Sequence, residues 1–242
     1  MHRVSVVIPT LNEEGTVGAL LADLSRQTLR PDEILVVDGG SRDGTARVVE
    51  RFPGVRLLGT GPPVANQRNL GGRRAAGDVL VFLDADVRLH RDFLRKLLEE
   101  FERRDLDLAC PRYLPYRSTL PIYCFHLLFN ALFRAAARLL PSGAGHCIVI
   151  RRKTFLKSGG FDPSLKFDDI ELIRRLGRRC RFGILGERVY VSDRRYREAG
   201  TLRAFATYLL LALIFATGRF RLANRVPYTF GEHGGPARYD SS

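Results

Sequence analysis

The chain has 242 residues, of which 45% are hydrophobic and 10% aromatic. This content excludes a disordered chain and suffices for one large domain with its own core. The formal net charge of +13 predicts an anionic partner, and charge alone does not choose between nucleic acid, anionic lipid and a phosphorylated substrate. The four cysteines form no C-x-x-C pair, and only three residues precede the first apolar segment, too few for a secretory signal. We therefore expect free thiols and a cytoplasmic protein.

The first half of the chain alternates apolar and helical segments. We expect strands at residues 4–8, 34–37, 55–58 and 79–83, and helices ending near residues 27, 52 and 76. Strands alternating with helices at this spacing predict an α/β fold, with a doubly wound, mostly parallel sheet flanked by helices.

The segment of residues 79–87 combines a buried strand with two acids. Its five apolar residues, VLVFL, end abruptly in Asp84 and Asp86. Such a run is typical of a strand buried on both faces, and ligands bind at the carboxyl ends of these strands. Two nearby carboxylates are costly without a cation, and Mg²⁺ takes one or two carboxylates together with phosphate oxygens. The pattern therefore predicts a metal that holds a diphosphate; a solvated turn before a helix is the alternative.

Two common nucleotide fingerprints are incomplete in this chain. Residues 59–61, Gly-Thr-Gly, begin like G-x-G-x-x-G, but prolines follow at 62 and 63 and the third glycine is missing. No G-x-x-x-x-G-K-[ST] motif is present. The sequence therefore argues against an NAD-binding fold and against a P-loop kinase.

The second half contains two long apolar segments. We expect a helix near 91–103, strands at 106–110, 147–150 and 189–191, and a wide apolar face at 120–140. Residues 204–217 carry no charge and are bracketed by Arg203 and Arg219; they are too few to span a bilayer and either pack on the domain or lie in the membrane interface. We expect one domain at 1–200, an apolar carboxyl-terminal helix within 201–230 and a polar tail at 231–242.

Three acids open a helix after residue 167. Asp168, Asp169 and Glu171 lie in its first turn, where negative charge favours the helix dipole. This structural explanation stands beside a catalytic one.

Four motifs together resemble the inverting family 2 glycosyltransferases of the GT-A fold. They are VVIPTLNEE at 6–14, VVDGGSRDGT at 36–45, DAD at 84–86, and GFD at 160–162 with FDDIEL at 167–172. Their order and spacing are specific, and the resemblance covers roughly residues 4–196. It implies a nucleotide-sugar donor, a divalent metal (Mn²⁺ or Mg²⁺) and direct displacement at the anomeric carbon.

The resemblance also implies roles for individual residues. Asp169 matches the catalytic base, with Asp168 and Glu171 beside it; Asp86 matches the direct metal ligand, and Asp84 would face ribose or metal. The implied nucleotide-binding residues are Pro9, Thr10, Asn12, Glu13, Asp38, Gly39, Arg68, Asp84 and Ala85.

The chain departs from the family pattern in three places. Asp168 stands where the acidic motif usually begins with Glu, which leaves open which acid is the base. No Q-x-x-R-W follows, which argues against a processive synthase. Arg194 and Arg195 replace a histidine metal ligand of some relatives and could grip a donor or lipid phosphate, while His146 either lines the acceptor pocket or is structural.

We therefore expect a metal-dependent glycosyltransferase, peripheral on the inner face of the cell membrane. We expect a UDP-linked donor first and a GDP-linked donor second. The expected acceptor is a lipid, a polyprenyl phosphate or another membrane-proximal group. The same chemistry on a soluble acceptor is the alternative, and a non-catalytic nucleotide-sugar binder is a distant one. Nucleic-acid binding is not expected, because no recognition motif accompanies the charge.

Overall fold

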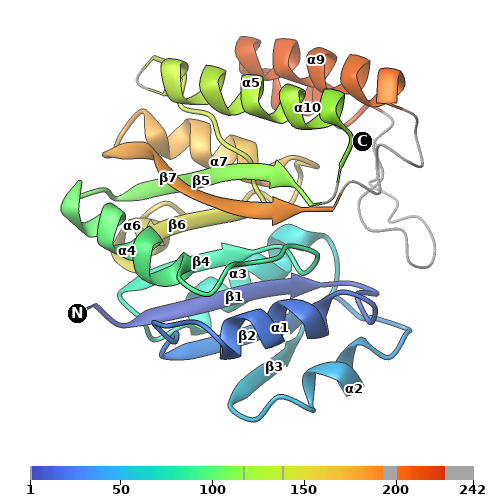
Figure 1. Cartoon of the computed structure of the whole chain (residues 1–242), viewed down its shortest axis with the longest axis vertical. Helices are drawn as coiled ribbons and strands as arrows, with labels where there is room; N and C mark the ends of the chain where they lie inside the picture. Colours follow the sequence, from blue (N-terminus) through green and yellow to red (C-terminus); the bar gives the residue numbers. More distant parts are fainter. Residues whose placement is uncertain (1, 117, 138, 193–200, 227–242) are drawn as a thin grey trace.

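The computed structural model describes residues 2–116, 118–137, 139–192 and 201–226. A seven-stranded sheet lies between two layers of helices, in the strand order β3-β2-β1-β4-β6-β5-β7 (Figure 1). The strands are β1 Val4–Thr10, β2 Glu33–Asp38, β3 Val55–Gly59, β4 Val79–Leu83, β5 Leu108–Pro115, β6 Cys147–Arg151 and β7 Phe182–Val191.

All strands except β6 run in the same direction. β1 pairs in parallel with β2 and β4, β2 with β3, and β5 with β7, whereas β6 runs antiparallel between β4 and β5. The expected mostly parallel sheet is confirmed. Because β6 is reversed, its first residue lies at the edge of the sheet where β4 ends.

The helices cover both faces of the sheet. Side chains of α1, α2 and α4 form one apolar core with β1 and β4, and those of α3, α6 and α7 form the other. The helices are α1 Val17–Ser25, α2 Thr45–Val49, α3 Val64–Arg74, α4 Phe93–Arg103, α5 Leu120–Ala136, α6 Arg152–Lys157, α7 Asp168–Gly177, α9 Thr201–Thr217 and α10 Phe220–Ala223. All five residues of β4 are buried, as a strand between two helical layers requires.

Two strands differ most from the bounds that the sequence predicts. β5 begins at Leu108 rather than 106, because the chain turns at Asp105 with φ 47°, and it continues past Pro111 through a bulge. β7 was expected only at 189–191 but begins at Phe182. Gly183 and Gly186 interrupt its apolar pattern, and pairing with β5 supplies what the local sequence lacks.

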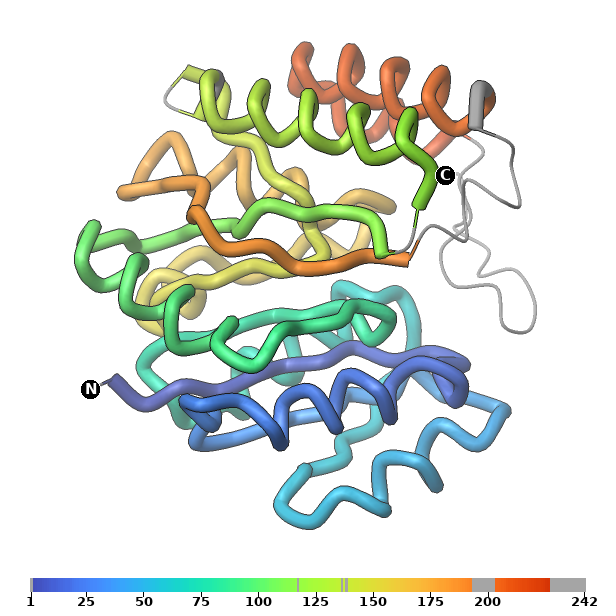
Figure 2. Tube along the Cα trace, viewed as in Figure 1, coloured from blue at the N-terminus to red at the C-terminus, as the bar shows by residue number. Residues whose placement is uncertain are grey.

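α5 and α9 lie side by side at the end of the molecule beyond β7, and α2 lies at the opposite end (Figures 1 and 2). The rings of Phe125 and Phe205 stack with centroids 4.2 Å apart, and Ile122 packs with Ala204. The helix expected over 120–140 ends at Ala136. None of the helices in the described ranges is long and apolar enough to cross a membrane.

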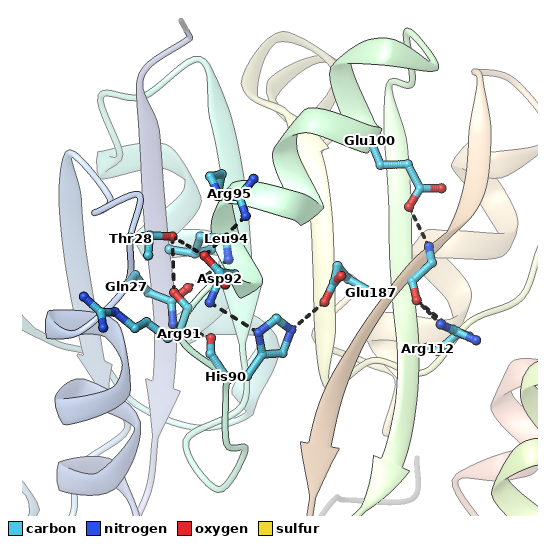
Figure 3. A network of polar contacts seen from close by, with 11 residues as sticks. Gln27, Thr28, His90, Arg91, Asp92, Leu94, Arg95, Glu100, Arg112 and Glu187 are labelled. Carbon is cyan, nitrogen blue, oxygen red and sulfur yellow. Dashed lines mark hydrogen bonds and ion pairs between the residues drawn. The ribbon is translucent and has the colours of Figure 1, made fainter.

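A polar network joins the two halves of the sheet on one face (Figure 3). His90 Nε2 lies 2.5 Å from Glu187 Oε2 of β7, and the carbonyl of His90 accepts a hydrogen bond of 2.8 Å from Gln27. The backbone N–H of Gly186 donates to Glu100 of α4 at 2.7 Å. These contacts fix the segment after β4 against β7 and so hold the Asp84–Asp86 turn in place.

Candidate functional site

The ends of three parallel strands and the start of the reversed strand meet at one edge of the sheet. Thr10 of β1 is in register with Asp38 of β2, and Asp84 follows directly after β4. The Asp84 N–H donates to the carbonyl of His146, the residue before β6, at 3.1 Å. The chain leaves β1 toward β2 on one side and enters β4 on the other, so this edge is a topological switch point, where open α/β sheets bind ligands.

The loop after β1 is tied to the loop after β2 through side chains. Asn12, with φ 55°, accepts a hydrogen bond from Arg42 N at 2.8 Å and donates its own N–H to Ser41 Oγ at 2.8 Å. Asp38 Oδ2 accepts from the N–H groups of Gly40 and Ser41 at 3.0 and 2.9 Å. Both predicted nucleotide-binding loops are therefore fixed before any ligand binds.

The remaining predicted nucleotide residues lie on the same two loops or next to them. Pro9 and Thr10 are buried, and Glu13 donates its N–H to Thr45 Oγ1 at 2.8 Å. Gly39 donates its N–H to the carbonyl of Thr10 at 2.8 Å, and a Cβ at this position would overlap the Gln67 side chain. A side chain at position 39 would therefore force the Gln67 side chain of α3 to shift.

Arg68 is buried and bridges two acids, Asp84 after β4 and Asp168 of α7. Its Nη2 donates to Asp84 Oδ1 at 2.9 Å, and its Nη1 donates to Asp168 Oδ1 at 2.8 Å. Its guanidinium also lies 5.4 Å from the ring centroid of Phe161. The two carboxylates raise the pKa of Arg68 further above its usual range, against the effect of burial, so the bridge is cationic throughout the working pH range. The predicted nucleotide contact of Arg68 stays a prediction, because both its terminal nitrogens already bind acids of the protein.

Asp84 is held ionised by two neighbours. Its Oδ2 lies 3.1 Å from His146 Nδ1, and Arg68 binds its other oxygen. Burial disfavours the charge, but His146 and Arg68 outweigh it and lower the pKa of Asp84 to about 2. His146 thus lies beside the acid of β4, with its ring centroid 5.8 Å from that of Tyr113.

Asp168 and Asp169, by contrast, have raised pKa values. Asp168 is only 1% exposed, and its Oδ2 has no hydrogen-bond partner among the described residues. Burial raises the pKa of Asp168 to about 7 although Arg68 opposes it, and the negative charge of Asp169 adds to the rise. Burial likewise raises the pKa of Asp169, with Asp84 contributing and Arg68 opposing. A carboxylate with a raised pKa is suited to accept a proton near neutral pH.

Asp169 is positioned by its own helix and by the segment before β6. Its Oδ1 accepts a hydrogen bond from Ile170 N at 2.7 Å. A Cβ on Gly145 would overlap its carboxylate, so the absence of a side chain there makes room for the acid. Asp169 is half-buried, whereas Asp168 is fully enclosed. Of these two acids, Asp169 is the one with access to a ligand.

Glu171, the third predicted acid, forms an ion pair with Arg175 of its own helix. Its Oε1 accepts from Arg175 Nε at 2.6 Å, and the same arginine donates to the carbonyls of Ser158 and Gly160 at 2.8 and 2.7 Å. This ion pair locks the turn before Phe161.

Asn69 is a site-supporting residue for which the sequence indicated no role. Its side-chain amide donates to the carbonyl of Phe161 and accepts from the N–H of Phe161, both at 2.8 Å, and so fixes the same turn next to the acids. The available signal was the polar run Gln67-Arg68-Asn69 inside a helix that packs against the sheet. Gly145 was signalled only by the Gly-Ala-Gly sequence before His146.

The acids at this edge offer few donors to a divalent cation. The described residues contain no group of three or more His, Cys, Asp or Glu side chains that could hold a metal. Both oxygens of Asp84 already have partners, while Asp86, two residues on, is half-buried at the same edge. This donor set fits a cation that takes few protein carboxylates and completes its shell with phosphate oxygens and water, as Mg²⁺ does.

The structure therefore brings the predicted site residues of the described ranges to one edge of the sheet. These are Pro9, Thr10, Asn12, Glu13, Asp38, Gly39, Arg68, Asp84, Ala85, Asp86, His146, Asp168, Asp169 and Glu171. Arg194 and Arg195, predicted to bind phosphate, and the tail at 231–242 lie outside the described residues.

Comparison with known proteins identifies a family. The model of the family described as Glycosyl transferase family 2 matches residues 5–158. A cholesterol galactosyltransferase of Borreliella burgdorferi is 23% identical over 197 residues, which cover 72% of this chain and 55% of that protein. The O-antigen chain rhamnosyltransferase RfbN of Salmonella typhimurium is 26% identical over 133 residues, which cover 53% of this chain and 42% of that protein. The chain thus spans about half the length of these curated relatives.

Solved structures share the fold. S. aureus TarS 1-349, in a crystal structure in complex with UDP, superimposes with a TM-score of 0.64 at 17% identity, over 78% of this chain and 60% of that one. This likeness shows a GT-A fold, as the sequence predicted.

Proposed function

The chain belongs to glycosyl transferase family 2, and from this premise we propose that it is an inverting glycosyltransferase that moves a sugar from a nucleotide diphosphate to an acceptor hydroxyl or phosphate. One observation supports this most strongly. The buried Arg68 binds both Asp84, after β4, and Asp168, which precedes Asp169. One side chain therefore connects the acid expected near the donor to the acids expected near the acceptor.

Asp169 is the general base of the proposed reaction. It removes the proton from an acceptor hydroxyl as that oxygen attacks the anomeric carbon, while the bond to the leaving diphosphate breaks on the opposite face. The configuration at the anomeric carbon is thereby inverted. Asp168 holds Arg68, and Glu171 holds Arg175; neither needs to touch the acceptor.

Asp86, assisted by Asp84, would hold Mn²⁺ or Mg²⁺ against the diphosphate. When bound, such a cation stabilises the negative charge that develops on the leaving group. Asp84 is ionised, because His146 and Arg68 lower its pKa to about 2 against the effect of burial. UDP is the first candidate for the nucleotide, since a structural neighbour binds UDP, and GDP is the second.

The proposed acceptor is lipid-linked or membrane-proximal, and the proposed location is peripheral, on the inner face of the cell membrane. Two relatives are named for cholesterol and for O-antigen chains, and the net charge of +13 favours an anionic surface. A soluble acceptor is the alternative, favoured by the stacking of Phe125 on Phe205, which shows that α5 and α9 have partners within the chain.

A thermal-shift panel tests the donor and the metal. Wild type is measured with UDP-, GDP- and dTDP-sugars, each with and without Mn²⁺ or Mg²⁺. A ligand that binds the folded state stabilises it by about 2.7 kcal/mol at a hundredfold excess over its dissociation constant. We expect a metal-dependent shift with one nucleotide class that is lost in Asp86→Ala.

Asp78→Ala is the matched control, because Asp78 directly precedes β4, at the opposite end of the strand. It should respond to donors as wild type does. The absence of a shift with every donor would contradict the proposed function, and an equal loss in both variants would show that the Asp86 effect is not local.

A further inference from the structure

The outward faces of α5 and α9 carry large apolar side chains in solvent. On α5 they recur at helical spacing along one stripe, and on α9 they cluster in its second half. The exposed residues are Leu120, Tyr123, Leu127, Leu128 and Leu132 of α5 and Leu209, Leu210 and Leu213 of α9, with exposed fractions from 37% to 74%. We call these eight residues the leucine face. Large apolar side chains exposed on two neighbouring helices are typical of an interaction site.

The leucine face is separate from the apolar core of the domain. Other side chains of both helices are already packed, Phe125 against Phe205 and Leu211 against Phe167. The outward leucines are therefore not needed to pack these helices on the domain.

The surroundings of the leucine face are basic. Arg134, Arg203, Arg219 and Arg221 are exposed on or next to α5, α9 and α10. The sequence contains no Asp or Glu between Asp107 and Asp162, nor between Glu198 and Glu232, so no acid on these helices offsets them. An apolar helix face flanked by arginines matches the interface of a membrane with anionic lipid.

We propose that the leucine face docks the protein onto an anionic lipid bilayer, lying in the headgroup region without crossing it. The inference rests on the proposed function, which calls for a membrane-proximal acceptor. A second copy of the chain is the weaker occupant, because self-association through this face would bring together two basic surfaces.

α9, which carries part of the leucine face, also packs against the residues that flank the candidate base. Phe167 and Ile170, which flank the acid pair, pack in one cluster with Leu211, Ile214 and Phe215 of α9. Lys166 Nζ donates to the carbonyl of Val226 at 3.0 Å, and Asn224 Oδ1 accepts from Lys166 N at 2.8 Å. The helix that carries part of the leucine face thus packs directly against the two residues that flank the acid pair.

Vesicle flotation of the full chain tests the docking. Wild type is compared on vesicles of phosphatidylcholine alone and of phosphatidylcholine with phosphatidylglycerol. We expect binding only with the anionic lipid. The double variant Arg219→Gln/Arg221→Gln should bind roughly thirtyfold more weakly, since each basic residue near such a surface contributes about 1 kcal/mol. Leu209→Gln/Leu213→Gln should weaken binding by at least about tenfold.

Two control variants match these changes elsewhere on the surface. Arg47→Gln/Arg51→Gln removes the same charge at the α2 end, and Leu156→Gln removes an exposed leucine of α6. Both should bind as wild type, with unchanged melting temperature in every variant. Equal losses in controls and test variants, tight binding to neutral vesicles, or a dimer in solution that the Leu209/Leu213 variant dissolves would each overturn the proposal.

Donor binding separates this proposal from the proposed function. If wild type shows the metal-dependent donor shift but ignores anionic vesicles, the docking is wrong and the transferase chemistry stands. If vesicles bind but no donor does, the reverse holds.

Discussion

Arg68 and Asp168 lie 100 positions apart in the chain and form a buried ion pair with 2.8 Å between Nη1 and Oδ1. The same guanidinium reaches Asp84 at 2.9 Å. A single cation therefore compensates an acid from each half of the fold.

Replacing Arg68 with Met should lower the free energy of unfolding by about 3–5 kcal/mol, because the buried Asp168 and the partly buried Asp84 lose their shared cation. Urea unfolding at neutral pH measures the change. Arg56→Met breaks an ion pair with Glu33 in which the arginine is half exposed, and should cost about 1 kcal/mol or less. Similar losses in the two variants would mean that the Arg68 bridge contributes little.

Asp169→Asn should reduce the transfer rate by a factor of about 10² to 10⁴, the usual contribution of a general base. Donor binding, measured by thermal shift, should persist. Glu171→Gln keeps a hydrogen-bond acceptor for Arg175 and should retain most of the activity. A Glu171 variant that loses more activity than the Asp169 variant would show that Asp169 is not the base.

The raised pKa of Asp168 predicts a pH dependence of stability. From its ordinary value of 3.8 up to about 7, the folded state holds a proton that the unfolded state has released, so this group's contribution to stability falls as pH rises through that window. Asp84 acts with the opposite sign, and its contribution is lost only as pH falls from about 4 to about 2. Urea unfolding between about pH 5 and 8 should show the decline in wild type and a flatter profile in Asp168→Asn; parallel profiles would refute the assignment.

Gly145→Ala should displace the Asp169 carboxylate, because the added Cβ would overlap it. A misplacement of about 1 Å can cost on the order of 10²-fold in rate, and we expect a loss of that order in kcat with donor affinity kept. Gly61→Ala is the control, since nothing lies within 4 Å of the place that its new Cβ would occupy. Wild-type kcat in Gly145→Ala would show that the acid tolerates the methyl group.

Asn224→Ala should lower kcat several-fold without changing donor affinity, because it removes two hydrogen bonds that join the carboxyl-terminal segment to the loop before the acids, at Lys166 N and at the carbonyl of Ser164. The expected loss of stability is about 1 kcal/mol for each bond. Thr207→Ala, which removes a bond within α9 to the carbonyl of Arg203, should leave kcat unchanged. Steady-state kinetics on both variants decides between a positioning effect and general destabilisation.

The sheet was predictable where burial alone decides the structure. Strands β1, β2 and β4 are continuous apolar runs that helices cover on both faces, and their ends carry the acids that the motifs indicated. β7 was largely missed, because Gly183, Gly186 and Glu187 break the pattern and its pairing with β5 is a long-range property. Sequence order could not reveal these partners.

The candidate site was predictable as a set of residues but not as a set of contacts. The resemblance to the family assigned Asp84 and Asp169 to one site, yet the bridging role of Arg68 requires three elements to meet. The different surroundings of Asp168, Asp169 and Glu171 were likewise not predictable. Glu171 is paired with Arg175, and Asp168 is fully buried. Polar contacts of this kind depend on tertiary packing, which local pattern does not encode.

The reversed strand β6 lies at the boundary between two parts of the sheet. Strands β3-β2-β1-β4 come from the first part of the chain and β6-β5-β7 from the second, and the ladder from Val79↔Arg151 to Leu83↔Cys147 joins the two parts within the sheet. Exchange of one part between relatives would have to preserve this ladder, the Arg68 bridge and the Figure 3 contacts across the boundary. A chimaera joined after β4 must therefore keep these contacts in order to fold.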